Sequence, residues 1–174
     1  PPVSEYPMQG GYDFVGTEDV PRMWAAAELF NTTGDAAYEA AFAAYFAAVS
    51  PERNQAMSWA NAYPIALFAY LTANNADETT WSSVAEVFQA QAQQILDVSL
   101  MSGYAVALND SVGGFEYVWG SNQVALAHGL YLMIANELFP DERFIHAALQ
   151  QVQYVMGVNP LAKMYISGIG SDPM

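Results

Sequence analysis

The strongest constraint on the fold is a helical spacing of apolar residues that runs through most of the chain. Apolar side chains recur three or four residues apart, the spacing of one helix face, in six segments: 19–35, 35–49, 61–75, 78–100, 121–139 and 141–157. Short polar turns join these segments in pairs, which is typical of helical hairpins. At 174 residues the chain has the length of one domain. The sequence therefore predicts an all-α fold of three helical hairpins.

Two of these hairpins resemble each other. A Glu-Leu-Phe triplet begins at Glu28 and again at Glu137, and each time a tight turn containing an aspartate and a second helix follow. A repeated helix pair buries its apolar faces by stacking on its neighbours. Within each pair the first helix is the more apolar, so we expect first helices on the inside and second helices outside. Gly34 and Gly157 are expected to end helices, and Ser121 and Asn122 to cap one.

Charge and composition exclude several partners. The chain carries 4 Lys+Arg against 18 Asp+Glu, a formal net charge of −14, whereas nucleic-acid phosphates require a positive surface. An anionic membrane surface is disfavoured for the same reason, and no apolar run is long enough to span a bilayer. We predict no nucleic-acid and no membrane partner. Because 53% of the residues are hydrophobic, we also expect other protein to cover part of the surface. Zero cysteines exclude disulfides and thiolate metal sites.

Aromatic residues stand near the starts of the inner helices. Tyr12, Trp59 and Trp119 each lie shortly before a first helix, and the irregular stretches that carry them should open at one end of the stack. Aromatic faces at the mouth of a cleft bind sugars, because the C–H face of a pyranose is apolar and stacks on a ring. Alternatively, these rings fill the core where the loops fold back. The spacing by itself leaves both interpretations open.

Three stretches, 19–38, 57–71 and 117–171, occur in the order and approximate spacing of the second half of a family-9 glycoside hydrolase catalytic domain. The most specific motifs are "WAAAELF" followed by "TGD", and "WGSN" followed by a helix pair and "YVMGVNPLAKMYISGIGS". From Gly10 onward the chain resembles that family. The resemblance implies that the three hairpins form about half of an (α/α)6 barrel, a toroid of inner and outer helices.

The resemblance also implies substrate-binding residues. Trp119 of "WGSN" is similar to the family's sugar-stacking tryptophan at the catalytic cleft, and Tyr12 to the tyrosine near the reacting sugar. Trp59 matches a third family residue, for which substrate contact and structural support are both open. Trp24 and Trp81 are assigned to packing.

Neither catalytic motif of the family occurs in this sequence. The family's base is an aspartate of an Asp-Ala-Gly-Asp motif near the start of the domain, and its acid is a glutamate near the end. Inverting hydrolysis needs two carboxylates about 6.5–9.5 Å apart. We therefore expect residues 1–174 to be an interior fragment of the catalytic domain, and we assign no catalytic residue. Asp110 and Glu116 are interpreted as solvated acidic residues.

Metal sites are not predicted. Many relatives bind calcium, and the resemblance leaves room for a structural calcium ion in the complete domain. Here Val20 and Pro21 stand where an acidic pair is expected, and Asn61 stands where an aspartate is expected. Calcium prefers six to eight oxygen ligands, several of them charged. We predict no metal in this chain and no required cofactor.

The two histidines are interpreted as structural. His128 lies within the most apolar helix and His146 on an outer helix. A metal-binding pair would need a second histidine four residues away, or a neighbouring glutamate, and the sequence places neither beside them. We therefore predict packing or a helix contact for His128.

The resemblance implies an inverting glycoside hydrolase that cleaves β-1,4-glucan, as cellulose or cello-oligosaccharides. This chain would supply aromatic residues of the cleft wall and pair with the remaining half of the barrel. The enzyme would be secreted, with its signal peptide outside these residues. One alternative is another (α/α)6 sugar enzyme, such as an exo-glycosidase, an epimerase or a lyase. The other is a non-catalytic helical-repeat interaction module, which should have a charged concave face.

Overall fold

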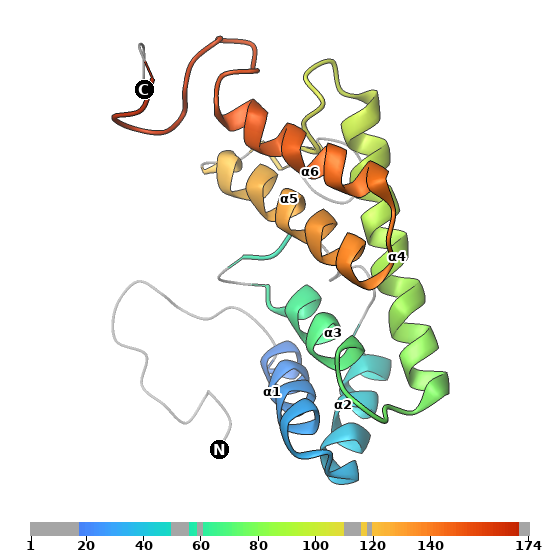
Figure 1. The fold of residues 1–174 in the computed structure, drawn as a ribbon. Helices are drawn as coiled ribbons and strands as arrows, with labels where there is room; N and C mark the ends of the chain where they lie inside the picture. Colours follow the sequence, from blue (N-terminus) through green and yellow to red (C-terminus); the bar gives the residue numbers. More distant parts are fainter. Residues whose placement is uncertain (1–17, 50–55, 59–60, 110–115, 118–119, 171–174) are drawn as a thin grey trace, which may run out of the picture.

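A computed structural model describes residues 18–49, 56–58, 61–109, 116–117 and 120–170. Six helices occupy them: α1 (Asp19–Thr33), α2 (Ala36–Ala48), α3 (Tyr63–Leu71), α4 (Glu78–Met101), α5 (Ser121–Leu138) and α6 (Glu142–Val155). They pair as three hairpins (Figure 1), so the predicted all-α fold is confirmed. None of the helices in this described part is both long and apolar enough to cross a membrane.

The turns between paired helices contain the signals that end one helix and begin the next. The carboxylates of Asp35, Asp77 and Asp141 cap α2, α4 and α6, accepting backbone N–H groups two or three residues further on at 2.8–2.9 Å. A capping carboxylate satisfies an orphan donor and lies at the positive end of the helix dipole. Gly34 ends α1 in the left-handed region, at φ 69°, as predicted. Local sequence therefore specifies each hairpin turn.

The last residues of the three first helices lie at a common end. Asn31 at the end of α1 donates to the Thr72 hydroxyl at the end of α3, at 3.2 Å. The Trp81 indole donates to the Leu71 carbonyl at 3.1 Å and meets the Phe139 ring edge-on, with centroids 6.2 Å apart. The packing role predicted for Trp81 is thus confirmed. Helices α1, α3 and α5 consequently all begin at the opposite end, toward the left of Figure 1.

Helix α3 is the most buried element of the described chain. Seven of its nine residues are buried, whereas only Phe42 is fully buried in α2, which agrees with an inner α3 and an outer α2. The Tyr70 ring stacks on Phe42 at 4.1 Å and on Phe30 at 5.8 Å, so aromatic contacts join the first three helices. Phe88 and Tyr131 stack at 4.4 Å and join α4 to α5. Large stacked rings supply most of the core contact between hairpins.

Trp24 lies outside the core that the described residues form, so its predicted packing role in the complete domain stays a prediction. Its side chain is 38% exposed, and its indole N–H donates to a Glu28 carboxylate oxygen at 2.9 Å. The buried face of α1 is formed by Met23, Ala27 and Phe30, spaced three or four residues apart. Trp24 follows Met23 by one residue, which rotates it about 100° away from that face.

Helices α5 and α6 approach so closely that a glycine is required. A Cβ atom on Gly129 would lie 3.2 Å from the Cβ atom of Gln151, a distance that forces a neighbour to move. The Gln151 amide is fully buried; its oxygen accepts from Ala107 N at 2.7 Å, and its nitrogen donates to the Ala105 and Ala147 carbonyls at 2.9 Å. One side chain therefore ties α6 to the segment that follows α4.

We expect Gln151→Ala to lower the free energy of unfolding by about 2–4 kcal/mol, because it leaves a cavity and unpaired buried backbone groups. Gln153→Ala, at an exposed position of the same helix, should change it by less than about 0.5 kcal/mol. Urea denaturation measures both. Equal effects of the two substitutions would contradict the role given to the buried amide.

Two fully buried tyrosines of α3 differ in the partners of their hydroxyl groups. The Tyr70 hydroxyl donates to Glu39 at 2.9 Å, and the same carboxylate oxygen accepts the Asp77 backbone N–H at 2.6 Å. The Tyr63 hydroxyl is buried without a hydrogen-bond partner among the described residues. Burial raises the pKa of Tyr63 to about 12. The two hydroxyls should therefore contribute to stability with opposite sign.

Tyr70→Phe is expected to lower the free energy of unfolding by about 1–3 kcal/mol, since it removes a hydrogen bond to a charged group. Tyr63→Phe should leave it unchanged or raise it by up to about 1 kcal/mol. A raised folded-state pKa means that wild-type stability falls with pH above the unfolded tyrosine value of about 10. Tyr63→Phe should lose less stability than wild type in that range, as measured by thermal melts from pH 7 to 11. A loss equal to or larger than that of wild type would contradict the role given to the Tyr63 hydroxyl.

Candidate functional site

All three predicted substrate-binding residues, Tyr12, Trp59 and Trp119, lie outside the described residues, so their roles stay predictions. Ser58, before Trp59, and Asn61 are described. These two residues form an antiparallel backbone bridge shortly before α3, with N···O distances of 3.1 and 3.3 Å.

The described residues do not fit the calcium site of the resemblance. The Asn61 side-chain oxygen accepts from Tyr63 N at 3.2 Å, at the start of α3. Glu18 bonds the Arg22 guanidinium at 2.9 Å, and Val20 is buried in the core. Across the described ranges, no group of three or more His, Cys, Asp or Glu side chains is placed to hold a metal. A structural calcium ion in the complete domain stays a prediction.

Helix α5 begins through a glycine instead of a side-chain cap. Gly120 occupies the capping position in the left-handed region, at φ 81°, and Ser121 is the first helical residue. The capping role predicted for Ser121 and Asn122 is therefore wrong. A left-handed residue reverses the chain sharply, which is strained for residues other than glycine. The reversal brings the preceding segment back toward α5.

Glu116 lies in that preceding segment and is fixed by several hydrogen bonds. One carboxylate oxygen is 3.1 Å from His128 Nε2, and the other accepts the Asn109 backbone N–H at 2.7 Å. The Glu116 backbone N–H also donates to the Asn109 carbonyl at 2.9 Å. The side chains of Glu116 and His128 are only 20% and 3% exposed. Glu116 is thus a largely buried clamp between Asn109 and α5.

Two interpretations from the sequence are corrected by this clamp. Glu116 is not a freely solvated carboxylate, and His128 does have a glutamate beside it. The partners are 12 residues apart in sequence, with Glu116 before α5 and His128 within it. Spacing rules detect partners three or four residues apart on one helix, so they could not find this pair. His146 is exposed on α6, as expected for an outer helix.

The geometry of the clamp supports positioning better than proton transfer. An ionised carboxylate can only accept, so Nε2 of His128 must carry the proton that it shares with Glu116. Nδ1 of His128 is buried and has no hydrogen-bond partner in the described ranges. Both oxygens of Glu116 lie within hydrogen-bond distance of a partner, an arrangement that holds the carboxylate in place.

Tyrosines gather beside the clamp. Tyr117 follows Glu116 directly and is 43% exposed. Tyr154 near the end of α6 packs edge-to-face with Tyr165, with ring centroids 6.0 Å apart. Burial raises the pKa of Tyr154, and the neighbouring hydroxyls of Tyr165 and Tyr117 raise it further. This end of the α5–α6 hairpin therefore presents aromatic side chains on a fixed backbone.

Asn159 holds the segment that carries Tyr165. The buried Asn159 amide nitrogen donates to the Tyr154 and Lys163 carbonyls, both at 2.8 Å. Its oxygen accepts the Leu161 and Lys163 backbone N–H groups at 3.2 and 3.3 Å. The Asn-Pro sequence after α6 is therefore a local turn that folds the chain back along that helix, where Tyr165 N donates to Val155 O at 2.9 Å.

Comparison with known proteins identifies the family. The model of glycosyl hydrolase family 9 matches residues 3–174. The chain belongs to glycosyl hydrolase family 9. The resemblance expected from the sequence motifs is thus confirmed.

Relatives of this family-9 chain include named endoglucanases. Endoglucanase D of Acetivibrio thermocellus is 29% identical over 166 residues, which make up 94% of this chain and 26% of that protein. Endoglucanase C of Cellulomonas fimi is 31% identical over 156 residues, or 84% of this chain and 13% of that protein. The chain therefore spans about a quarter or less of the curated relatives that it matches.

Solved structures of family-9 endoglucanases share the fold. A metagenome-derived glycoside hydrolase family 9 endoglucanase is 35% identical and superposes with a TM-score of 0.83, over 99% of this chain and 30% of that chain. Endoglucanase J30 of family 9 is 27% identical with a TM-score of 0.85, over 97% of this chain and 32% of that chain. The prediction that the hairpins form part of an (α/α)6 barrel is confirmed.

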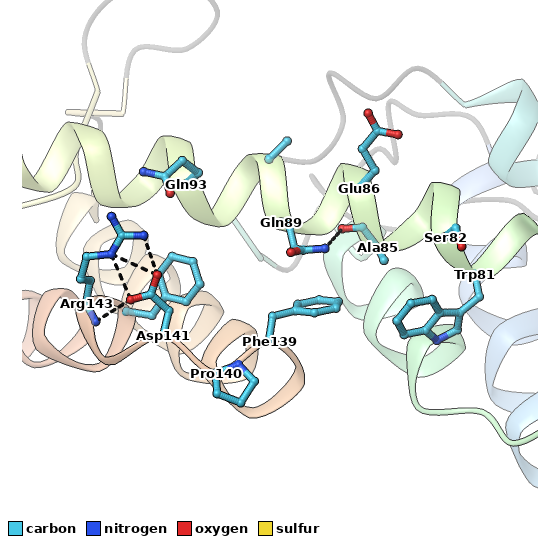
Figure 2. A pocket seen from close by; sticks show the side chains of 12 residues that line it. Trp81, Ser82, Ala85, Glu86, Gln89, Gln93, Phe139, Pro140, Asp141 and Arg143 are labelled. Carbon is cyan, nitrogen blue, oxygen red and sulfur yellow. Dashed lines mark hydrogen bonds and ion pairs between the residues drawn. The ribbon is translucent and has the colours of Figure 1, made fainter. Parts of the chain in front are cut away.

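The family-9 chain also has an open groove of about 910 Å³ at its other end, between α4 and the α5–α6 turn. Figure 2 shows Trp81 at one end of the groove, the Asp141 and Arg143 pair at the other, and Phe139 between them. The Arg143 side chain, bonded to the Asp141 carboxylate, lowers the pKa of that group. A general acid requires the opposite shift, and the lining adds only Glu86 as a second carboxylate. We assign no catalytic role to the groove.

Proposed function

We propose that this chain works as part of a catalytic domain that cleaves β-1,4-glucan, in cellulose or cello-oligosaccharides, with inversion. The observation that carries the proposal is the match of residues 3–174 to family 9, together with relatives named endoglucanases. The site chemistry agrees with a neutral sugar ligand. The chain has a net charge of −14, and the predicted sugar-binding residues Tyr12, Trp59 and Trp119 are all aromatic.

The catalytic carboxylates are proposed to come from the rest of the domain. Inversion requires one carboxylic acid and one carboxylate about 6.5–9.5 Å apart, with a water between them. The Asp-Ala-Gly-Asp motif of the family's base does not occur in the sequence, and Glu116 is already bonded on both oxygens. Under this proposal the 174 residues form one part of the cleft wall, with Trp119, Tyr12 and Trp59 as its sugar-binding residues.

Exposed apolar side chains support a partnership with the remaining barrel. On α5 and α6 they are spaced three or four residues apart, as on one face of each helix: Leu126, Leu130 and Met133, and Leu149, Val152 and Met156. Their exposed fractions reach 55% at Met133, which is unfavourable in water. We therefore propose that these faces pack against the hairpins that complete the ring.

Secretion and independence from a cofactor belong to the same proposal. Cellulose is an insoluble polymer, so its hydrolase must meet it outside the cell. Hydrolysis by a carboxylate pair needs only water as a second reactant. The non-catalytic module and the other sugar enzymes remain alternatives, but the relatives' names favour the endoglucanase.

We expect Trp119→Ala, made in the complete domain, to weaken cellotetraose binding by about 1–3 kcal/mol, the scale of a lost stacking surface. Its melting temperature should change little. Trp81→Phe, in the helix packing at the opposite end, should lower the melting temperature and leave binding unchanged. Titration calorimetry and thermal melts measure both. Normal binding with a much lower melting temperature for Trp119→Ala would show that Trp119 is a core residue.

The purified 174-residue chain alone should not hydrolyse carboxymethyl cellulose, because it lacks the family's acid and base motifs. It should bind an apolar dye through the exposed faces of α5 and α6. Exchanging Leu130 and Val152 for glutamine should reduce dye binding, and exchanging Gln153 for alanine should not. Hydrolysis that copurifies with the chain through several columns would contradict a catalytic pair outside it.

A further inference from the structure

Stability alone does not explain why Glu116 and His128 form a buried polar pair. A buried ion pair or charged hydrogen bond gains little over apolar residues of similar size, because both groups lose their hydration. Apolar residues at these two positions would fit the surroundings. Val106, Leu108, Ala125, Tyr154 and Val155 form a buried apolar cluster around the same end of α5. A buried polar pair in such surroundings indicates that position, and not stability, is what the pair contributes.

What the clamp positions is the backbone on either side of Glu116. It ties this residue to Asn109 by two hydrogen bonds and to α5 through His128. Four residues later Gly120 fixes the chain direction at the start of α5. Tyr117 follows Glu116 directly in the sequence, yet its side chain is 43% exposed. An exposed ring next to an anchored residue is preorganised for a ligand.

We propose that Tyr117 is a glucan-contacting residue of the cleft wall, and that Glu116 and His128 are positioning residues that hold it in place. The inference rests on the proposed function and extends it to residues that the sequence motifs did not single out. The contact of Glu116 with His128 places the neighbouring Tyr117 beside the first half of α5. The apolar face of its ring can stack on a pyranose.

The proposal predicts a change in KM, whereas a purely structural clamp predicts only a change in melting temperature. A contact made equally to bound substrate and transition state changes KM and leaves kcat nearly unchanged. Loss of the clamp should act through Tyr117, so the two substitutions should not be additive. A clamp that only stabilises the fold would lower the melting temperature without changing KM.

The test uses the complete domain with cellotetraose as substrate. Tyr117→Ala should raise KM about tenfold and change kcat less than about twofold, whereas Tyr117→Phe should behave like wild type because the ring remains. Glu116→Ala should raise KM about three- to tenfold. In Glu116→Gln the amide can still accept from Asn109, so KM should return toward wild type. Glu137→Ala, an exposed glutamate near the end of α5, is the matched control and should have no effect.

The decisive measurement is the double variant. Glu116→Ala combined with Tyr117→Ala should raise KM no further than Tyr117→Ala alone. Additive effects, or a KM that Tyr117→Ala leaves unchanged, would overturn the inference. If Glu116→Ala does not fold, Glu116→Gln and His128→Gln replace it in the cycle with the same expectation. A wild-type domain that does not cleave cellotetraose or cellulose would instead contradict the proposed function.

Discussion

The stacking of Tyr70 on Phe42 is the contact on which the first half of the structure depends. Its ring lies 4.1 Å from Phe42 and is also stacked on Phe30, so α1, α2 and α3 share one aromatic core. The hydroxyl of the same residue bonds Glu39, whose carboxylate also accepts the backbone of the α3–α4 turn at Asp77. One side chain therefore fixes both the spacing of three helices and the direction in which the chain leaves them.

The second half of the chain depends on polar contacts between helices that approach closely. Gly129 lets α5 and α6 touch, and the buried Gln151 amide then reaches across to the segment after α4. At Asn109 the backbone N–H of that segment donates to Glu116, and the other carboxylate oxygen of Glu116 contacts His128 on α5. These bonds run continuously from the helix packing to the predicted cleft end. Rigid packing at a distance thus determines where residues near the substrate can lie.

The arrangement explains how part of a barrel can carry a defined binding surface. The hairpin turns and their aspartate caps lie at one end and hold the helices in register. The other end carries the longer connections, from α2 to α3 and from α4 to α5. Apolar faces on α5 and α6 remain exposed at the same time, as expected when neighbouring hairpins complete a closed core. Under the proposed function, the substrate is bound at the end opposite the hairpin turns.

The sequence by itself determined the helices, their pairing and the family. Apolar spacing and acidic turns are local, so six segments, the glycine at position 34 and the resemblance to family 9 could be predicted from it. Only the tertiary structure decided which faces are buried and which distant residues meet. Trp24 looked like a core residue but lies one residue off the buried face of α1. Glu116 looked solvated, yet it pairs with His128 within α5. Such contacts depend on the path of the backbone, and no local pattern in the sequence encodes that path.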